Sequence, residues 1–81
     1  MLTEAQRKAL WNHSWTLTAH LNFGGGKYVW SYRCATLDCH KRIYSQKGIV
    51  ETTYFIDDQE FDSIEELVAA LQEQGRLIVP D

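Results

Sequence analysis

The sequence predicts an α+β fold in which one antiparallel sheet of four or five strands packs against an N-terminal helix and a C-terminal amphipathic helix. Apolar and polar residues alternate over most of 14–56, glycine-containing turns interrupt that alternation, and an apolar pattern of helical period follows at 63–74. The predicted order is helix, four strands, helix and a short final strand. A chain of 81 residues is long enough for one domain with a thin core, so we expect a single compact domain over 1–81.

The first predicted element is a helix over 3–12. Thr3 and Gln6 have the spacing of a capping box, and Glu4 suits the positive end of a helix. The residues that follow are good helix formers, and the polar run at 12–14 ends the pattern.

The clearest alternation runs from Ser14 to Phe23. Five apolar residues occupy every second position and five polar ones lie between them, so a regular strand would place the two sets on opposite faces. The apolar set is Trp15, Leu17, Ala19, Leu21 and Phe23. We therefore expect a half-buried antiparallel strand here.

Three more strands are predicted over 27–35, 39–46 and 49–56. Three glycines at 24–26, the run 36–38, the pair Lys47-Gly48 and the pair Asp57-Asp58 provide the turns between and after them. The last strand is rich in β-branched and aromatic residues, which favour sheets.

The second helix has the strongest local signals. Ser63 with Glu66 and Asp62 with Glu65 both have capping-box spacing, and Gly75 suits a left-handed helix end. One apolar stripe is formed by Ile64, Leu67, Val68 and Leu71. After the helix, the apolar run 77–79 predicts either a short edge strand or a packing tail.

The sequence contains no catalytic motif, phosphate-binding loop or full set of metal ligands. We therefore expect no enzyme and no cofactor. The N-terminus lacks the basic and apolar regions of a signal peptide, and no apolar run reaches the length of a membrane span. We expect a cytoplasmic protein that does not bind membranes. Two cysteines are too few for a disulfide scaffold, which agrees with this compartment.

One segment has the ligand types that zinc prefers. Cys34, Cys39 and His40 supply two thiolates and an imidazole, but a fourth ligand is missing nearby. In a hairpin the two cysteines would face each other, while His40 would point to the other side of the sheet. We therefore expect a pair of reduced core cysteines or a cross-strand disulfide, and no metal.

The distribution of charge suggests a partner. Residues 1–50 hold seven basic and two acidic side chains, and residues 51–81 hold one basic and nine acidic ones, which agrees with the net charge of −3. An anionic turn and helix would suit a basic patch on another protein, including a nucleic-acid-handling enzyme with a basic groove. The predicted function is a small protein-binding inhibitor or adaptor, encoded by a phage or bacterium and of the anti-defence or immunity type. The predicted contact residues are Asp57, Asp58, Glu60, Asp62, Glu65, Glu66 and Glu73.

The alternative function is nucleic-acid binding through a basic, aromatic sheet. Exposed aromatic rings can stack on bases while arginine and lysine contact phosphates. The candidate cations are Arg33, Lys41, Arg42 and Lys47, and the nearby aromatic residues are Tyr28, Trp30, Tyr32 and Tyr44. Alternation places Arg33 on the face opposite the first three aromatic residues, and the negative net charge is unusual for a nucleic-acid-binding domain.

Residues 15–71 also contain short motifs like those of the Src-homology-2 domain. These are Gly26, Tyr28 and Ser31 in one strand, His40 and Ile43 in the next, then Phe55-Ile56, Phe61-Asp62-Ser63-Ile64 and Leu67-Val68. The chain resembles that family in having a central antiparallel sheet between two helices. The resemblance implies peptide binding, with His40 helping to form a phosphotyrosine pocket.

The chain departs from the Src-homology-2 pattern at the phosphate-binding position. The resemblance places His20 where the family has an arginine, and a histidine lacks the bidentate guanidinium that clamps a phosphate. A degenerate peptide-binding domain of this kind is thus a further alternative. We also expect that an exposed edge of the sheet could pair with a second copy to form a homodimer.

Overall fold

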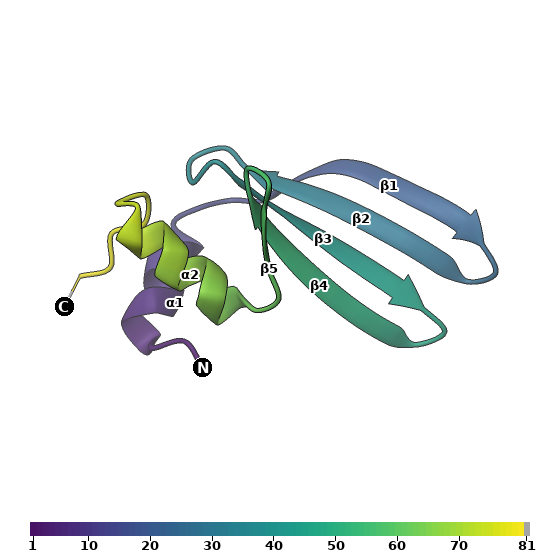
Figure 1. Ribbon diagram of the computed structural model, residues 1–81, viewed down its shortest axis with the longest axis horizontal. Helices are drawn as coiled ribbons and strands as arrows, with labels where there is room; N and C mark the ends of the chain where they lie inside the picture. Colours follow the sequence, from purple (N-terminus) through teal and green to yellow (C-terminus); the bar gives the residue numbers. More distant parts are fainter. Residues whose placement is uncertain (81) are drawn as a thin grey trace.

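The computed structural model describes residues 1–80 and has the predicted α+β architecture. Its elements are α1 (Glu4–Trp11), β1 (Thr16–Gly24), β2 (Lys27–Cys34), β3 (Cys39–Gln46), β4 (Ile49–Ile56), β5 (Gln59–Phe61) and α2 (Ile64–Glu73). The strands form one antiparallel sheet in the order β1-β2-β3-β4-β5. Both helices lie together at one end of the sheet, and the hairpins β1–β2 and β3–β4 extend away from them (Figure 1). The molecule is therefore elongated, with extents of 46 × 23 × 21 Å.

Two tight turns close the extended hairpins where the sequence predicts them. Gly25 and Gly26 have φ angles of 62° and 77°, and Lys47 and Gly48 have φ angles of 50° and 83°. Positive φ at both central residues matches the right-handed twist of the flanking strands. Lysine pays a steric penalty in this region that glycine avoids, so the second turn is the more strained of the two.

Both helices begin at the predicted caps. The Thr3 hydroxyl accepts from the Gln6 N–H at 3.1 Å, and the Gln6 side chain accepts from the Thr3 N–H at 2.9 Å, which completes a capping box. At α2 the cap is Ser63, whose hydroxyl accepts from the Glu66 N–H at 3.2 Å. The capping box predicted for Asp62 and Glu65 does not form, because the chain enters the helix one residue later.

The hydrophobic core lies almost entirely at the end that carries the helices. We call this region the helical end and define it as α1, α2, β5, the turn 35–38, the tail 74–80 and the strand ends that they contact. The buried cluster there consists of Ala9, Cys34, Leu37, Cys39, Ile56, Phe61, Leu67, Val68, Leu71 and Leu77. Because α2 supplies three of its members from one apolar stripe, the predicted amphipathic pattern correctly identified the packing face of that helix.

The prediction of a half-buried first strand is wrong. All nine residues of β1 are exposed, and a bulge at Thr18 shifts the pairing between Leu17 and Ala19. Leu17 pairs with Tyr32, whereas Ala19 pairs with Ser31, so the bulge moves the later apolar residues to the opposite face. The Thr18 hydroxyl donates to the Ser31 carbonyl at 3.1 Å across this irregularity.

The fifth strand comes before α2 rather than at the end of the chain. Gln59–Phe61 pairs with β4 and places Phe61 opposite Tyr54. Residues 77–79 are not a strand, and Leu77 is buried in the core at 3% exposure. The apolar run after α2 is therefore a packing tail, the second of the two predicted outcomes.

Candidate functional site

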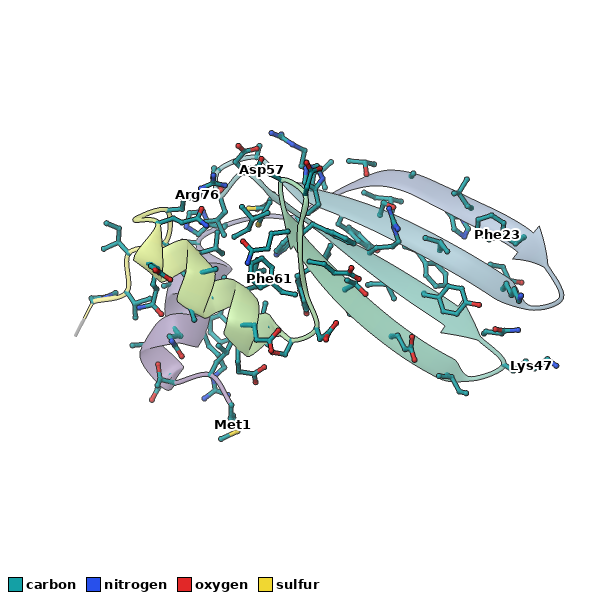
Figure 2. All side chains as sticks on the ribbon, viewed as in Figure 1. Met1, Phe23, Lys47, Asp57, Phe61 and Arg76 are labelled. Atoms are coloured by element: carbon teal, nitrogen blue, oxygen red, sulfur yellow. The ribbon has the colours of Figure 1, made fainter. Side chains whose placement is uncertain are left out.

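The part of the sheet that extends beyond the helices is uncovered by any other element within residues 1–80. We call it the outer sheet and define it as residues 18–31 and 42–53. No helix lies on either of its faces (Figure 1), and Val29 is its single buried residue. Apolar side chains occur near both hairpin tips. Phe23 is 63% exposed (Figure 2), and Ile49, which follows the Lys47-Gly48 turn, is 65% exposed.

One face of the outer sheet carries a row of aromatic rings, and we call it the aromatic face. The register places His20 opposite Trp30 and Asn22 opposite Tyr28, with side chains on the same side of the sheet. The His20 and Trp30 rings are stacked with centroids 5.3 Å apart, and Tyr28 and Trp30 are stacked at 5.8 Å. This row exists only because the bulge at Thr18 turns His20 to the side of Trp30.

A single cation marks the boundary between this face and the helical end. The Lys41 ammonium lies 4.5 Å from the centre of the Trp15 ring and 5.2 Å from that of Tyr32. Burial lowers the pKa of Lys41 below its ordinary value. The register gives this face no carboxylate from β1 to β4, because Glu51 pairs with Tyr44 on the other side. The face is thus apolar, aromatic and weakly cationic.

The opposite face is more polar and carries charges of both signs. Arg42 lies 5.4 Å from the Phe55 ring, and Arg33 forms an ion pair with Asp38 at 3.0 Å. Beside them is a shallow hollow of about 280 Å³, lined by Ser31, Tyr32, His40, Lys41, Arg42, Phe55 and Asp57. The carboxylate in this lining offsets the cations, so the hollow is not a dedicated anion site.

The candidate nucleic-acid residues do not form one surface. Lys41 lies on the aromatic face, Arg33 and Arg42 lie on the opposite face, and Lys47 is in the turn at the hairpin tip. Tyr32 already has Lys41 against its ring, and the rings of Trp30 and Tyr28 stack on each other. These contacts leave few free ring faces for stacking on bases.

The predicted acidic contact residues lie at the helical end. Asp57 and Asp58 occupy the β4–β5 turn, Glu60 is in β5, and Asp62 precedes the cap of α2. Glu65 and Glu66 are in the first turn of α2 and Glu73 is its last residue. All seven side chains are exposed, so this set borders solvent along the turn and the helix.

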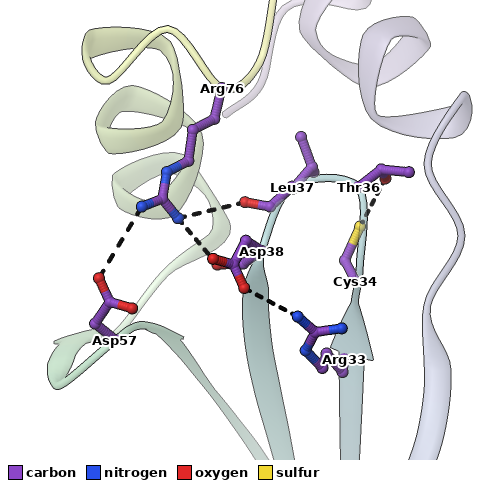
Figure 3. A network of polar contacts seen from close by, with 7 residues as sticks. All are labelled: Arg33, Cys34, Thr36, Leu37, Asp38, Asp57 and Arg76. Carbon is purple, nitrogen blue, oxygen red and sulfur yellow. Dashed lines mark hydrogen bonds and ion pairs between the residues drawn. The ribbon is translucent and has the colours of Figure 1, made fainter.

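Several of these carboxylates also have local structural contacts. The Glu65 carboxylate lies 3.4 Å from the N-terminal amine, and the Glu66 carboxylate accepts from the Asp62 N–H at 3.1 Å. Asp57 is 4.0 Å from Arg76, whose guanidinium also donates to the Asp38 carbonyl at 3.0 Å (Figure 3). Arg76 therefore links the tail to the turns that contain Asp38 and Asp57. Asp57 thus makes a structural contact although its side chain is exposed.

The two cysteines are free, buried and paired across β2 and β3. Cys34 and Cys39 are directly opposite in the register, and each is fully buried. Burial and the neighbouring Cys34 thiol raise the pKa of Cys39 to about 12. Of the two predicted outcomes, a reduced core pair or a cross-strand disulfide, the structure has the two cysteines unlinked. His40 pairs with Arg33 on the far side of the sheet, as the alternation predicts, and within residues 1–80 no cluster of three potential metal ligands forms.

The two histidines of the Src-homology-2 resemblance cannot share a pocket. His20 lies on the aromatic face with Trp30, whereas His40 lies on the opposite face beside Phe55. The sheet separates them, so the phosphotyrosine site that the resemblance implies does not form.

The sequence reasoning missed the stacked row and the exposure of β1. Alternation predicts that Tyr28, Trp30 and Tyr32 share one face, and the register confirms it. The same alternation places His20 on the polar side of a regular strand, and no sequence signal identifies the bulge that reorients it.

No family model matches this chain, and no curated protein or solved structure is similar enough to match it. Among residues 1–80, neither helix has the length and apolar character needed to cross a lipid bilayer.

Proposed function

We propose that this protein is a non-enzymatic module that binds another protein through the aromatic face of its outer sheet. The observation that carries the proposal is the absence of any covering layer over that face within the described residues, although it presents Trp30, Tyr28 and Val50. Tyrosine and tryptophan are enriched in protein interfaces, because they combine large apolar area with a polar group.

An uncovered apolar face has a free-energy cost that a partner would remove. Val50 is 63% exposed and lies on this face next to Ser45 of the neighbouring strand β3. Covering apolar surface is favourable by about 25 cal/mol per Å². Because backbone hydrogen bonds already hold the four strands of the outer sheet in place, little backbone freedom is lost when a partner docks.

The acidic surface supports a basic partner at the adjoining helical end. Glu66 and Glu73 are seven residues apart, so they lie on the same side of α2, while Leu67 and Leu71 face the core. A partner that covers the aromatic face and also reaches this helix would meet opposite charge there. An inhibitor or adaptor of a nucleic-acid-handling enzyme, of the anti-defence or immunity type, fits both surfaces.

The test is in-cell cross-linking of the tagged protein, with quantification of the recovered protein partner for matched variants. Val50→Glu places a charge on the aromatic face, and Ile78→Glu makes the same change in the tail, where Ile78 is 79% exposed. We expect Val50→Glu to reduce recovery of the partner at least roughly tenfold, since a buried unpaired charge is costly. Ile78→Glu should leave recovery unchanged.

Two further arms separate the alternatives. The triple variant Glu65→Lys, Glu66→Lys, Glu73→Lys tests the acidic surface, and nuclease treatment before recovery tests a nucleic-acid bridge. If Val50→Glu has no effect and the triple variant abolishes recovery, the acidic surface is the main contact and the aromatic face is not. Loss of recovery after nuclease treatment would instead favour nucleic-acid binding.

A further inference from the structure

Strand β1 is the long free edge of the sheet. It spans nine residues, all of them exposed, and pairs with β2 on one side only. The other edge is formed by β5, which has three residues including Glu60, and by residues 49–53 of β4, which pair with β3 alone and include Glu51. In an antiparallel strand, alternate residues direct their backbone N–H and C=O groups away from the paired neighbour. The outer side of β1 therefore presents unpaired backbone groups along its length.

This edge lacks the side-chain features that usually block pairing. Natural edge strands are protected by lysine, by proline, by inward-pointing charges or by short length. β1 contains no charged residue and no proline. Its two bulges lie towards its ends, between Leu17 and Ala19 and between Asn22 and Gly24, and leave the centre of the strand regular. Three of the molecule's exposed large apolar residues, Leu17, Leu21 and Phe23, lie on this strand.

The regular centre of β1 is symmetric about His20. In the register with β2, Ala19 and Leu21 flank His20 at equal distance, and both are apolar. Beyond them the two bulges leave Thr18 and Phe23 without a partner, so Leu17 and Asn22 occupy the next equivalent positions. A two-fold axis at His20 would bring Ala19 opposite Leu21 of a second copy, and the strand contains no charged residue to oppose this pairing.

We propose that β1 pairs with β1 of a second copy of this chain, antiparallel and about a two-fold axis at His20. Ala19 of each copy then lies opposite Leu21 of the other, and no like charges meet. The two five-stranded sheets join into one continuous sheet. A two-fold axis perpendicular to the sheet keeps equivalent faces on the same side, so the aromatic faces of both copies become one surface.

The oligomeric state tests this pairing. Sedimentation across a concentration series should show a reversible monomer–dimer equilibrium for the natural protein. Leu21→Lys places a charge at the centre of the edge, and we expect it to weaken dimerisation by more than about tenfold. The matched control is Ile49→Lys, because Ile49 is comparably exposed and lies at the other hairpin tip. A monomer at every concentration, or equal loss in both variants, overturns the proposal. Circular dichroism of each variant checks that the fold is retained.

The register is tested by single cysteines on β1. His20→Cys places a thiol opposite its own copy across the two-fold axis, within the distance that a disulfide spans. Asn22→Cys lies on the same face but opposite Leu17 of the second copy, too far from its equivalent to cross-link. Because Cys34 and Cys39 are fully buried, a mild oxidant acts on the introduced thiol. We expect a covalent dimer from His20→Cys and only a trace from Asn22→Cys. Equal cross-linking of both variants, or of neither, overturns the pairing.

Discussion

The helical end and the outer sheet both contain apolar and aromatic residues, but only one of them has an interior. Ten of the eleven buried apolar residues belong to the cluster at the helical end, and the exception, Val29, is the sole buried residue of the outer sheet. The outer sheet instead depends on backbone pairing and on contacts between neighbouring side chains such as His20 and Trp30. The first region therefore maintains the fold, and the second leaves its surface uncovered.

The difference follows from the lengths of the elements. Helices of eight and ten residues extend roughly 12 and 15 Å, whereas strands of eight or nine residues extend roughly 27 to 30 Å. Five strands side by side are also about 19 Å wide between the outermost strand axes. Two such helices, placed together at one end, cannot cover even one face, so part of the sheet stays exposed wherever they pack.

The largest expected effect is at the centre of the helical core. Leu71 is fully buried, and we expect Leu71→Ala to lower the free energy of unfolding by about 3 kcal/mol through lost apolar burial and an unfilled cavity. Leu21→Ala in the outer sheet, where Leu21 is 50% exposed, should cost less than about 0.5 kcal/mol. Urea unfolding of both variants measures this contrast. Similar losses in the two variants would show that the outer sheet also has an effective core.

The sequence predicted the helical end well because its signals are local. A cap at Ser63, an apolar stripe ending at Leu71 and a glycine at position 75 each act within a few residues of the chain. The hairpin turns at Gly25-Gly26 and Lys47-Gly48 were predicted for the same reason.

The outer sheet was predicted less well because the alternation of apolar and polar residues shows which residues share a face of a strand. It does not show whether another element covers that face. The pattern from Trp15 to Phe23 indicates which residues share a face only while the strand stays regular, and the bulge at Thr18 breaks that condition. Whether a face is buried depends on where distant helices pack, which no residue of β1 encodes. The element lengths alone, however, would have predicted incomplete coverage.

A smaller effect is expected from the buried thiols, and it depends on pH. An unfolded Cys39 thiol loses its proton near its ordinary pKa of 9.0, whereas the folded one keeps its proton until its pKa of about 12. Above pH 9 the unfolded state therefore binds fewer protons than the folded state, so the free energy of unfolding falls as pH rises from 9 towards 12. Cys39→Ala should remove this contribution to the loss of stability above pH 9. At neutral pH the same substitution should lower the free energy of unfolding by about 1 kcal/mol.

The matched control for this pH dependence is Val68→Ala. Val68 is fully buried in the same cluster, and its truncation weakens packing while leaving both thiols in place. Urea unfolding at neutral pH and at several values above pH 9 compares the three proteins. If Cys39→Ala and the natural protein lose stability in parallel above pH 9, other groups account for the alkaline loss.

The smallest expected effect on stability is that of removing the His20 ring, and this change should affect local opening of the outer sheet more than global unfolding. His20 is exposed, and its stacking on Trp30 is a cross-strand contact outside the core. We expect His20→Ala to cost about 0.5 kcal/mol in unfolding, typical of such a pair. Hydrogen exchange of β1 amides should nevertheless become faster while that of α2 amides does not change, because local opening of an edge strand does not require the helices to separate. Leu21→Ala, in the same strand but on the face opposite the ring stack, is the control. Both variants are measured at concentrations where the protein is monomeric. Uniformly faster exchange in α2 as well as β1 would mean that the two regions open as one unit, and the division between them would then not hold.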